Sequence, residues 1–513
     1  MGAMQRCAPV LAALALWSCA ADVQAAVIAL DTVSDSSATA TLSPDPGDVG
    51  KPADIWMGAV YQGTLYMRDG STWVRHAGDP LPVAIRGQTL AAATRVTVVE
   101  QIDFSGLAGL DLYVGYGTSE QDMLTSPGKM AKIYTVPAIS AVDNVATITV
   151  DAGPPDLVPG ALNIPFVSVT VCSPGSASNC QTIDHIHVDT GSTGLRLISA
   201  TLSPSLALPL QKNLLGAPLA ECVQFADATL VWGPVRLADV KIAGEHASSV
   251  PVQIIGDPAF STVPPACSGV PSDTVQSFGA KGILGVGVFR EDCGSYCAQY
   301  AGNTQYYACP ASGCVGAAVP LAQQVAHPVA RFARNNNGVL VQLPAIPAGG
   351  AVNTTGSLVF GIGTQANNGL GAAKVLEVDP SFGDMTTLYG GVAYMNSVID
   401  SGANVLFLPS SVGIPTCSRR DLVAPGFLCP SATQTLSVIN HGVNGVTDTV
   451  NFAVGNAHTL LSNFQMTAFN NLAAPNSDPY GFSWGLPFFF GRSVFTAIEN
   501  APTPGGTGPY VAY

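Results

Sequence analysis

Two short stretches of this chain place an aspartate in a tight turn between apolar segments. The first contains Asp189-Thr-Gly-Ser, and the second contains Asp400-Ser-Gly-Ala. The apolar residues on both sides predict a buried strand that breaks into a turn and then resumes. One such tripeptide is usually a surface turn, but two with matching flanks are harder to attribute to chance. Two carboxylates held close cannot both ionise easily, so one keeps its proton and the pair can serve as acid and base.

A second feature repeats downstream of each aspartate. Gly-Ile-Leu-Gly-Val-Gly, from Gly282 to Gly287, follows the first, and Phe-Phe-Phe-Gly-Arg-Ser, from Phe488 to Ser493, follows the second at a similar separation. This repeated order resembles the bilobal pepsin-like aspartic proteases, in which a strand threads beside each catalytic turn and glycine permits close approach. The chain also resembles secreted bacterial proteins of unassigned function with a His-Val-Asp-Thr-Gly-Ser motif and a terminal Trp-Gly-Leu-Pro-Phe-Phe-Phe-Gly-Arg run.

The resemblance implies a mainly all-β fold, two pepsin-like lobes and a role for each turn residue. Asp189 and Asp400 would be the catalytic carboxylates, which activate water without a metal or cofactor. Thr190 and Ser401 would lock the two turns together, and Ser192 would donate a hydrogen bond to its carboxylate, which Ala403 cannot do. The supporting residues implied are Thr190, Gly191, Ser192, Ser401 and Gly402.

The chain departs from the family pattern at the lid of the cleft. The hairpin predicted over residues 222–242 lacks the Tyr-Gly of the family's flap, so Phe225 or Trp232 would have to serve as the apolar lid of the substrate cleft. Arg196 replaces the family's supporting tryptophan. Two functions therefore stay open: an endopeptidase acting on peptide or protein, or a non-catalytic cleft that binds peptide or glycan. His185 and His187 are interpreted as ordinary strand histidines.

The chain divides into several predicted segments. Residues 1–25 fit a secretory signal, and Cys19 only faintly resembles a lipid-anchoring site. Residues 26–137 predict a β-sandwich module whose aromatic residues belong to its core. If that module did the binding, the chain would be a surface-associated structural protein, a third hypothesis. Proline-rich residues 138–162 predict a linker, and residues 163–338, 339–500 and 501–513 predict two lobes and a tail, with a helix over 319–334.

Composition limits the possible partners. The formal net charge is −14 and only 11% of residues are charged, which argues against nucleic acid and anionic membrane surfaces. No apolar segment after the signal is long enough to span a membrane, and a secreted, periplasmic or cell-surface monomer is expected.

Cysteine usage agrees with export. Of twelve cysteines, two precede the predicted cleavage site, and the remaining ten suit five disulfides in an oxidising compartment. The spacing favours the pairs Cys172 with Cys180 and Cys417 with Cys429, and then Cys222 with Cys267. The group Cys293, Cys297, Cys309 and Cys314 supplies the rest. A zinc site in that group is disfavoured, because no histidine is interleaved.

Overall fold

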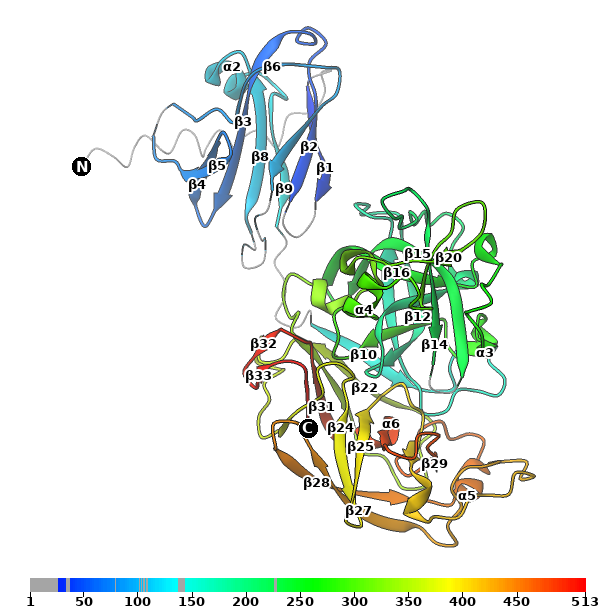
Figure 1. Cartoon of the computed structure of the whole chain (residues 1–513). Coiled ribbons are helices and arrows are strands. Elements are labelled where there is room, and N and C mark those ends of the chain that lie inside the picture. Colours follow the sequence, from blue (N-terminus) through cyan, green and yellow to red (C-terminus); the bar gives the residue numbers. More distant parts are fainter. Residues whose placement is uncertain are drawn as a thin grey trace. The chain divides into compact units, whose positions relative to one another are not determined.

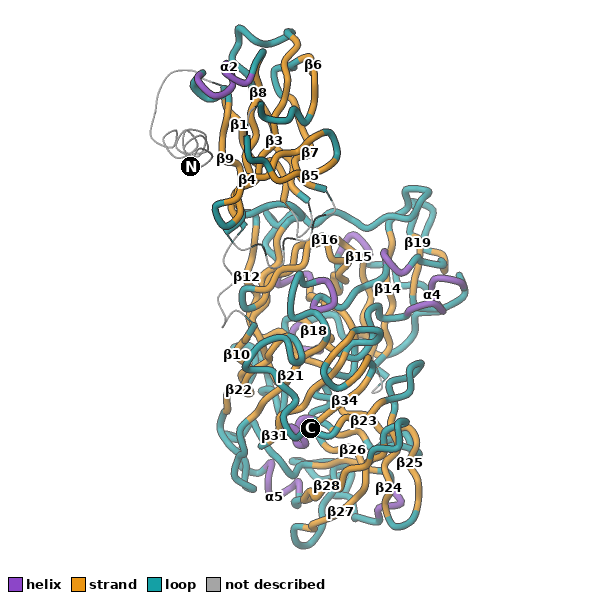
Figure 2. The backbone as a smooth tube through the Cα atoms, turned by 90° about the vertical axis from the view of Figure 1, so that its left-hand side faces the viewer, coloured by secondary structure: helices purple, strands orange, loops and turns teal. Residues whose placement is uncertain are grey.

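The computed structural model describes residues 26–33, 37–78, 80–100, 102, 104, 107, 109–136, 144–225 and 228–513. The chain forms two compact units, Met1–Ser140 and Ala141–Tyr513, and strands dominate both (Figure 1; Figure 2). The predicted signal segment, with Cys19, lies outside the described residues. In the ranges given above, no helix combines the length and the apolar character needed to cross a membrane.

The first unit contains two antiparallel sheets that share one core. Its strands are β1 (Val27–Val33), β2 (Ala38–Ser43), β3 (Pro52–Tyr61), β4 (Thr64–Asp69), β5 (Thr72–Arg75), β6 (Ile85–Thr89), β7 (Thr94–Val99), β8 (Asp111–Gly117) and β9 (Met130–Thr135), with helix α2 (Glu120–Thr125). Strands β1, β2 and β7 form one sheet, and β5, β4, β3, β8 and β9 form the other, with β6 paired to β3. Alternating apolar residues of both sheets, such as Ala40 and Leu42 from one and Ile55 and Met57 from the other, meet in this core.

The second unit contains two halves joined by a continuous sheet. The first half contains β10 (Val145–Val150), β11 (Pro165–Cys172), β12 (Cys180–Asp189), β13 (Thr193–Ile198), β14 (Leu219–Gln224), β15 (Thr229–Ile242), β16 (Glu245–Ile255), β17 (Val270–Pro271), β18 (Gly282–Val286), β19 (Tyr306–Ala308), β20 (Val315–Gly316), α3 (Val275–Phe278) and α4 (Gly294–Gln299). The second half contains β21 (Gly338–Leu343), β22 (Thr354–Phe360), β23 (Val375–Glu377), β24 (Met385–Tyr389), β25 (Val392–Ile399), β26 (Leu406–Leu408), β27 (Gln434–His441), β28 (Thr447–Val454), β29 (Ala473–Pro475), β30 (Ser483–Trp484), β31 (Arg492–Ala497), β32 (Pro502–Thr503), β33 (Gly506–Thr507), β34 (Tyr510–Ala512), α5 (Ala457–Leu461) and α6 (Leu486–Phe489). Strands β10 and β22 pair where the two halves meet (Figure 1).

The same strand arrangement occurs once in each half. In the first, β18 lies between β12, to which it is parallel, and β13, to which it is antiparallel. In the second, β30 lies between β25 and β26 with the same two orientations. The outer neighbours also correspond, because β13 pairs in parallel with β16 and β26 pairs in parallel with β29. Each half therefore threads a later strand between the two strands that flank its aspartate turn.

Five disulfides close local loops of the second unit. They join Cys172 to Cys180, Cys222 to Cys267, Cys293 to Cys297, Cys309 to Cys314 and Cys417 to Cys429. The pairs expected from spacing are thus confirmed, and the four-cysteine group forms two disulfides between near neighbours. Five disulfides are consistent with an extracellular or secreted protein.

Three segments differ from the sequence-based expectation. Within the predicted linker, Val145–Val150 is strand β10, because its alternating apolar residues Ala146, Ile148 and Val150 are buried in the joining sheet. Within the predicted tail, β34 pairs with β31 and β23, so the chain end belongs to the same sheet. The helix expected over 319–334 is wrong: Pro320 and Pro328 divide it into two short 3-10 turns, Leu321–Gln323 and Val329–Arg331.

Candidate active site

The two aspartate turns meet between the halves of the second unit. Asp189 is the last residue of β12, and Asp400 directly follows β25. Each carboxyl lies against the glycine of the opposite turn: a Cβ on Gly191 would be 2.6 Å from the Asp400 carboxyl carbon, and a Cβ on Gly402 would overlap the Asp189 carboxyl. The neighbouring Asp189 charge also acts on Asp400 and raises its pKa. Glycine is therefore required at both positions for the carboxyls to approach.

Thr190 and Ser401 hold the turns together by reciprocal hydrogen bonds. The Thr190 hydroxyl donates to the Ile399 carbonyl (3.1 Å) and accepts from the Ser401 amide (2.9 Å). The Ser401 hydroxyl donates to the Val188 carbonyl (2.8 Å) and accepts from the Thr190 amide (3.0 Å). All four bonds are buried, so each stabilises the registration of the two turns without competition from water.

The surroundings of the two carboxylates are unequal. The Gly191 amide donates to Oδ1 of Asp189 (2.7 Å), and the Ser192 hydroxyl donates to Oδ2. The hydrogen bonds that Asp400 accepts come from two backbone amides, those of Gly402 (2.8 Å) and Ala403 (3.3 Å), and both reach Oδ1. Burial, together with the charge of Asp189, raises the pKa of Asp400 well above its usual range. Asp400 therefore holds the proton and Asp189 carries the charge when the pair shares one proton.

A glycine in or directly after each threaded strand packs against the turn beside it. A Cβ on Gly285 would be 2.6 Å from the Thr193 amide nitrogen. In the second half, Gly485 has this position, because its Cβ would overlap the carbonyl oxygens of Val405 and Ala403. The run Phe488–Gly491 was predicted to be the threaded strand of the second half, and this prediction is wrong. The threaded strand is β30, and Leu486–Phe489 is helix α6, which follows it.

A hollow opens beside the first turn, on the side of the second half. Its volume is about 60 Å³, and its walls are somewhat more apolar than polar. It is lined by Thr190, Gly191, Ser192, Thr193, Gly287, Val288, Phe289, Val378, Phe382, Gly383, Met385, Val398, Ile399 and Val511. Phe382 is 76% exposed there. A space of this size has room for a few waters or one small side chain. Apart from Thr190, Gly191 and Ser192, sequence patterns did not single out these wall residues, since they come from five separate segments.

The residues expected to form a lid lie elsewhere. Trp232 on β15 is buried, contacts Tyr307 edge-on and donates from Nε1 to the Phe260 carbonyl (2.7 Å). Phe225 packs edge-on against Phe278. Neither residue lines the hollow beside the turns. The hairpin itself exists, as β14 and β15, but its aromatic residues are used in packing, so the lid assignment of Phe225 and Trp232 is corrected.

Arg196 stands where the resemblance implies a supporting tryptophan, and it forms a buried ionic cluster. Its Nη2 contacts Oε1 of Glu221 (2.9 Å) and Oδ2 of Asp292 (2.7 Å), and its Nη1 donates to the Thr193 carbonyl. Tyr306 donates to Oδ1 of Asp292 (2.7 Å). Burial and the neighbouring Glu221 raise the pKa of Asp292 well above its usual range. The cluster therefore joins the strand leaving the first turn to the β14 and β19 strands.

The two strand histidines have different surroundings. His185, at a bulge with φ of 54°, is half-buried and lies near Asp184 and Asp151 (3.2 and 3.6 Å). His187 is buried two residues before Asp189, on the same face of β12. Burial lowers the pKa of its ring, and the Asp189 charge opposes that effect.

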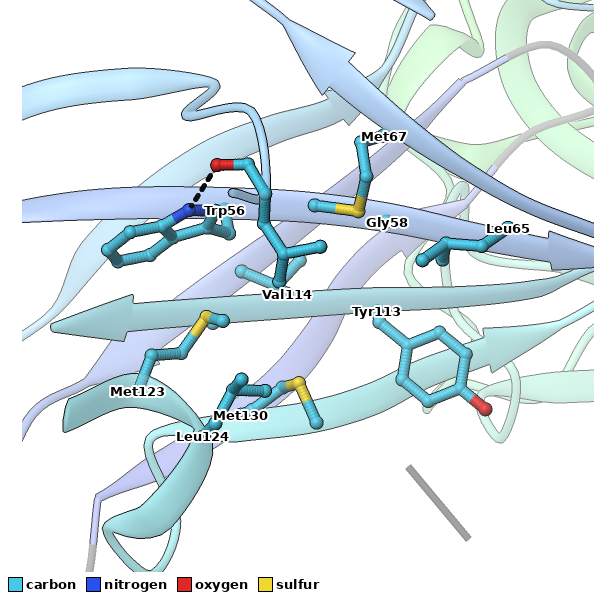
Figure 3. Close-up of a pocket in the computed structure, with 11 residues that line it drawn as sticks. Trp56, Gly58, Leu65, Met67, Tyr113, Val114, Met123, Leu124 and Met130 are labelled. Atoms are coloured by element: carbon cyan, nitrogen blue, oxygen red, sulfur yellow. Dashed lines mark hydrogen bonds between the residues drawn. The ribbon is translucent and has the colours of Figure 1, made fainter. Parts of the chain in front are cut away.

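The first unit has a separate hollow that is wholly apolar in character. Figure 3 shows Trp56, Met67, Met123 and Met130 around it, with the Trp56 Nε1 donating to the Leu81 carbonyl (3.3 Å). Sugar hydroxyls need hydrogen-bond partners, and this wall offers almost none. The lining of this hollow therefore favours core packing for Trp56 and the other aromatic residues of the module, rather than a surface that binds glycan.

The described parts of the chain contain no group of three or more His, Cys, Asp or Glu side chains arranged to hold a metal ion.

Fold and site together define a mainly β protein in which two aspartates from equivalent turns meet. The chain belongs to the family described as "Protein of unknown function (DUF3443)", whose model matches residues 140–513. This range covers the second unit and includes both aspartates, so the site lies within the part that defines the family. A search of curated proteins found no match.

Proposed function

We propose that this chain is an exported, pepsin-like aspartic endopeptidase that uses Asp189 and Asp400 to hydrolyse peptide bonds. The observation that carries the proposal is the approach of the two carboxyls across opposing glycines, held by the reciprocal bonds of Thr190 and Ser401. Such a pair can share one proton, which is the arrangement that acid and base catalysis by two carboxylates requires.

The unequal surroundings assign a role to each carboxylate. Asp189, which accepts from Gly191 and Ser192, takes a proton from the attacking water. Asp400, whose pKa is raised by burial and by Asp189, donates its proton to the carbonyl oxygen of the peptide bond. The apolar hollow walled by Phe289, Phe382 and Val398 accepts a side chain of the substrate next to the bond that is cut.

A non-catalytic cleft is the second candidate, and two observations favour it. Asp400 lacks a side-chain hydroxyl donor because residue 403 is alanine, and no aromatic residue of the β14–β15 hairpin lines the hollow. In that case the same hollow and turns bind a peptide without cutting it.

Cleavage of denatured casein between about pH 3 and 7 separates the two candidates. We expect slow cleavage by the purified mature protein, inhibition by a statine peptide, and loss of at least about 100-fold in rate with Asp189→Asn or Asp400→Asn, since either change removes the shared proton. Circular dichroism of both variants controls for folding. Binding of the statine peptide without cleavage would establish the non-catalytic cleft, and neither binding nor cleavage would refute both.

A further inference from the structure

Three methionines of the first unit converge on one hollow. Nine methionines occur in the chain, and two of them lie in the predicted signal segment. Of the remaining seven, Met67, Met123 and Met130 all line the hollow beside Trp56 (Figure 3). Met67 and Met123 are buried. Met130 is partly exposed, which gives a small ligand a route from solvent.

The hollow lies apart from the core that the two sheets share. Ile55 and Met57 on β3 enter that core, so Trp56 between them faces the other side of the sheet. The outer face of an antiparallel sheet is commonly polar, whereas here Trp56, Met67 and Met123 are buried in a second, smaller core. Packing between the two sheets therefore does not account for these side chains.

Glycines in the sheet let the sulfur atoms reach its surface. Met67 lies directly opposite Gly58, and Met130 lies directly opposite Gly115. A Cβ on Gly58 would be 3.2 Å from the Met67 sulfur, and a Cβ on Gly115 would overlap the Met123 sulfur. A glycine inside a strand often marks a place where a ligand approaches closely. The three thioethers therefore gather over one small area of the sheet.

Trp56 adds an aromatic ring to the same site. It pairs with Gly115 across β3 and β8, two residues from Gly58. Its Nε1 donates to the Leu81 carbonyl (3.3 Å), and the Leu81 amide donates to Oε2 of Glu120 (2.9 Å). Hydrogen bonds in such a chain polarise one another, so the Glu120 carboxylate makes the indole more electron-rich. The face of a tryptophan ring attracts a cation, most strongly where water is excluded.

We propose that this hollow binds a soft monovalent cation of the copper(I) type through the thioethers of Met67, Met123 and Met130. The Trp56 ring lies beside the bound ion. Thioether sulfur selects copper(I), whereas hard cations prefer oxygen ligands, and the Tyr113 hydroxyl points away from the sulfur atoms (Figure 3). The cavity volume of about 30 Å³ exceeds what one water needs. The site is independent of the aspartate pair and of the proposed peptidase activity.

Titration of the full mature chain with silver(I), a redox-stable analogue of copper(I), tests the site in chloride-free buffer. The ten described cysteines are all in disulfides, so their thiols do not compete. In nuclear magnetic resonance of methyl-labelled methionines, one equivalent of silver(I) should shift the signals of Met67, Met123 and Met130. The signal of Met395, which is 66% exposed, should stay in place. Magnesium should shift none of them, because it binds oxygen.

Substitution of the ligands gives the matched variants. Leucine is close to methionine in volume, so Met67→Leu and Met123→Leu should keep the fold, which circular dichroism checks. Each should weaken silver(I) affinity at least about 10-fold, since even the loss of an outer partner of a metal ligand costs about that much. Met395→Leu is the control and should leave the affinity unchanged.

Two results would overturn the proposal. One is the absence of binding at one equivalent of silver(I), or a shift at Met395 in place of the three methionines. The other is an affinity that Met67→Leu and Met123→Leu leave unaltered. If a variant fails to fold, the methyl shifts of the wild type decide. Casein cleavage enters none of these results, so failure of the ion site and failure of the peptidase proposal are distinguishable.

Discussion

At the scale of single residues, the two aspartates differ by one hydroxyl group. Ser192 donates to Oδ2 of Asp189, whereas the equivalent residue in the second turn is Ala403, which offers only its amide. A hydrogen bond to a carboxylate stabilises its charged form. The missing hydroxyl therefore adds to burial and to the Asp189 charge in keeping Asp400 protonated.

Restoring that hydroxyl should change the pH profile in a defined direction. With Ala403→Ser, a hydroxyl donor would favour ionised Asp400, and a bond to a charged group is worth roughly 1.5–3 kcal/mol. The pair would then lose its shared proton at lower pH, so the alkaline limb of kcat/KM should move down by about 1 to 2 pH units. Casein cleavage from pH 3 to 8 measures the limb. An alkaline limb that stays in place would mean that Asp400 does not set it.

At the scale of elements, each half threads a strand between the two strands of its turn, and a glycine in or directly after that strand packs against the turn. In the first half the glycine could be predicted, since Gly285 lies in an apolar strand of five residues. In the second half the threaded strand has two residues, Ser483–Trp484, which is too short to give a period. The longer apolar run after it matched the pattern better, although its first residues belong to helix α6, with Pro487 in the first turn.

Gly485→Ala should destabilise the second unit and impair the site. A Cβ at this position would overlap the backbone oxygens of Val405 and Ala403, which cannot move without shifting the Asp400 turn. Overpacking of this kind costs about 1–3 kcal/mol, or more against backbone. Urea unfolding measures the loss. Gly349→Ala is the matched control, because an added Cβ there meets nothing within 4 Å. Equal stability of the two variants would contradict the close packing at residue 485.

The sequence predicted local features better than those that depend on long-range packing. Disulfides between near neighbours, such as Cys172 with Cys180, could be predicted because the loop between the cysteines is short. The burial of Trp232 could not, since its partners Tyr307 and Phe260 are far away in the chain. Strand β10 was missed for the same reason: prolines at 154 and 155 indicated a linker, while its pairing partner β22 lies in the other half.

At the scale of the molecule, buried groups with opposite pKa shifts determine how stability depends on pH. Burial and a neighbouring carboxylate raise the pKa of Asp400 and Asp292. Burial lowers the pKa of His327 to about 4. The raised carboxyls contribute stability that is present at acid pH and falls as pH rises through their folded pKa. The histidine contributes stability that is present above its unfolded pKa and is lost as pH falls towards about 4.

The contribution of Asp292 can be measured separately from that of Asp400, because Asp292 belongs to the Arg196 cluster. At acid pH Asp292 is protonated, and Arg196 is paired with one negative charge, on Glu221. At neutral pH the folded cluster must either keep the proton on Asp292 or bury a second negative charge. Unfolding therefore releases a proton in this range. The free energy of unfolding then falls by up to about 1.4 kcal/mol per pH unit for this group.

Asp292→Asn should make that dependence shallower. The amide cannot ionise, and its oxygen can still accept from Arg196 and Gln305, which reach Oδ2 of Asp292 at 2.7 and 3.1 Å. The variant should lose stability at pH 4, where the aspartic acid is protonated and can also donate to Glu221. The difference in the free energy of unfolding between the variant and the wild type should then shrink as pH rises towards 7. Urea unfolding at pH 4, 5.5 and 7 measures the difference, with Asp156→Asn, an exposed carboxyl, as control. A constant gap between wild type and Asp292→Asn across these pH values would show that Asp292 is ionised throughout, and the acid preference of the fold would then have to come from Asp400.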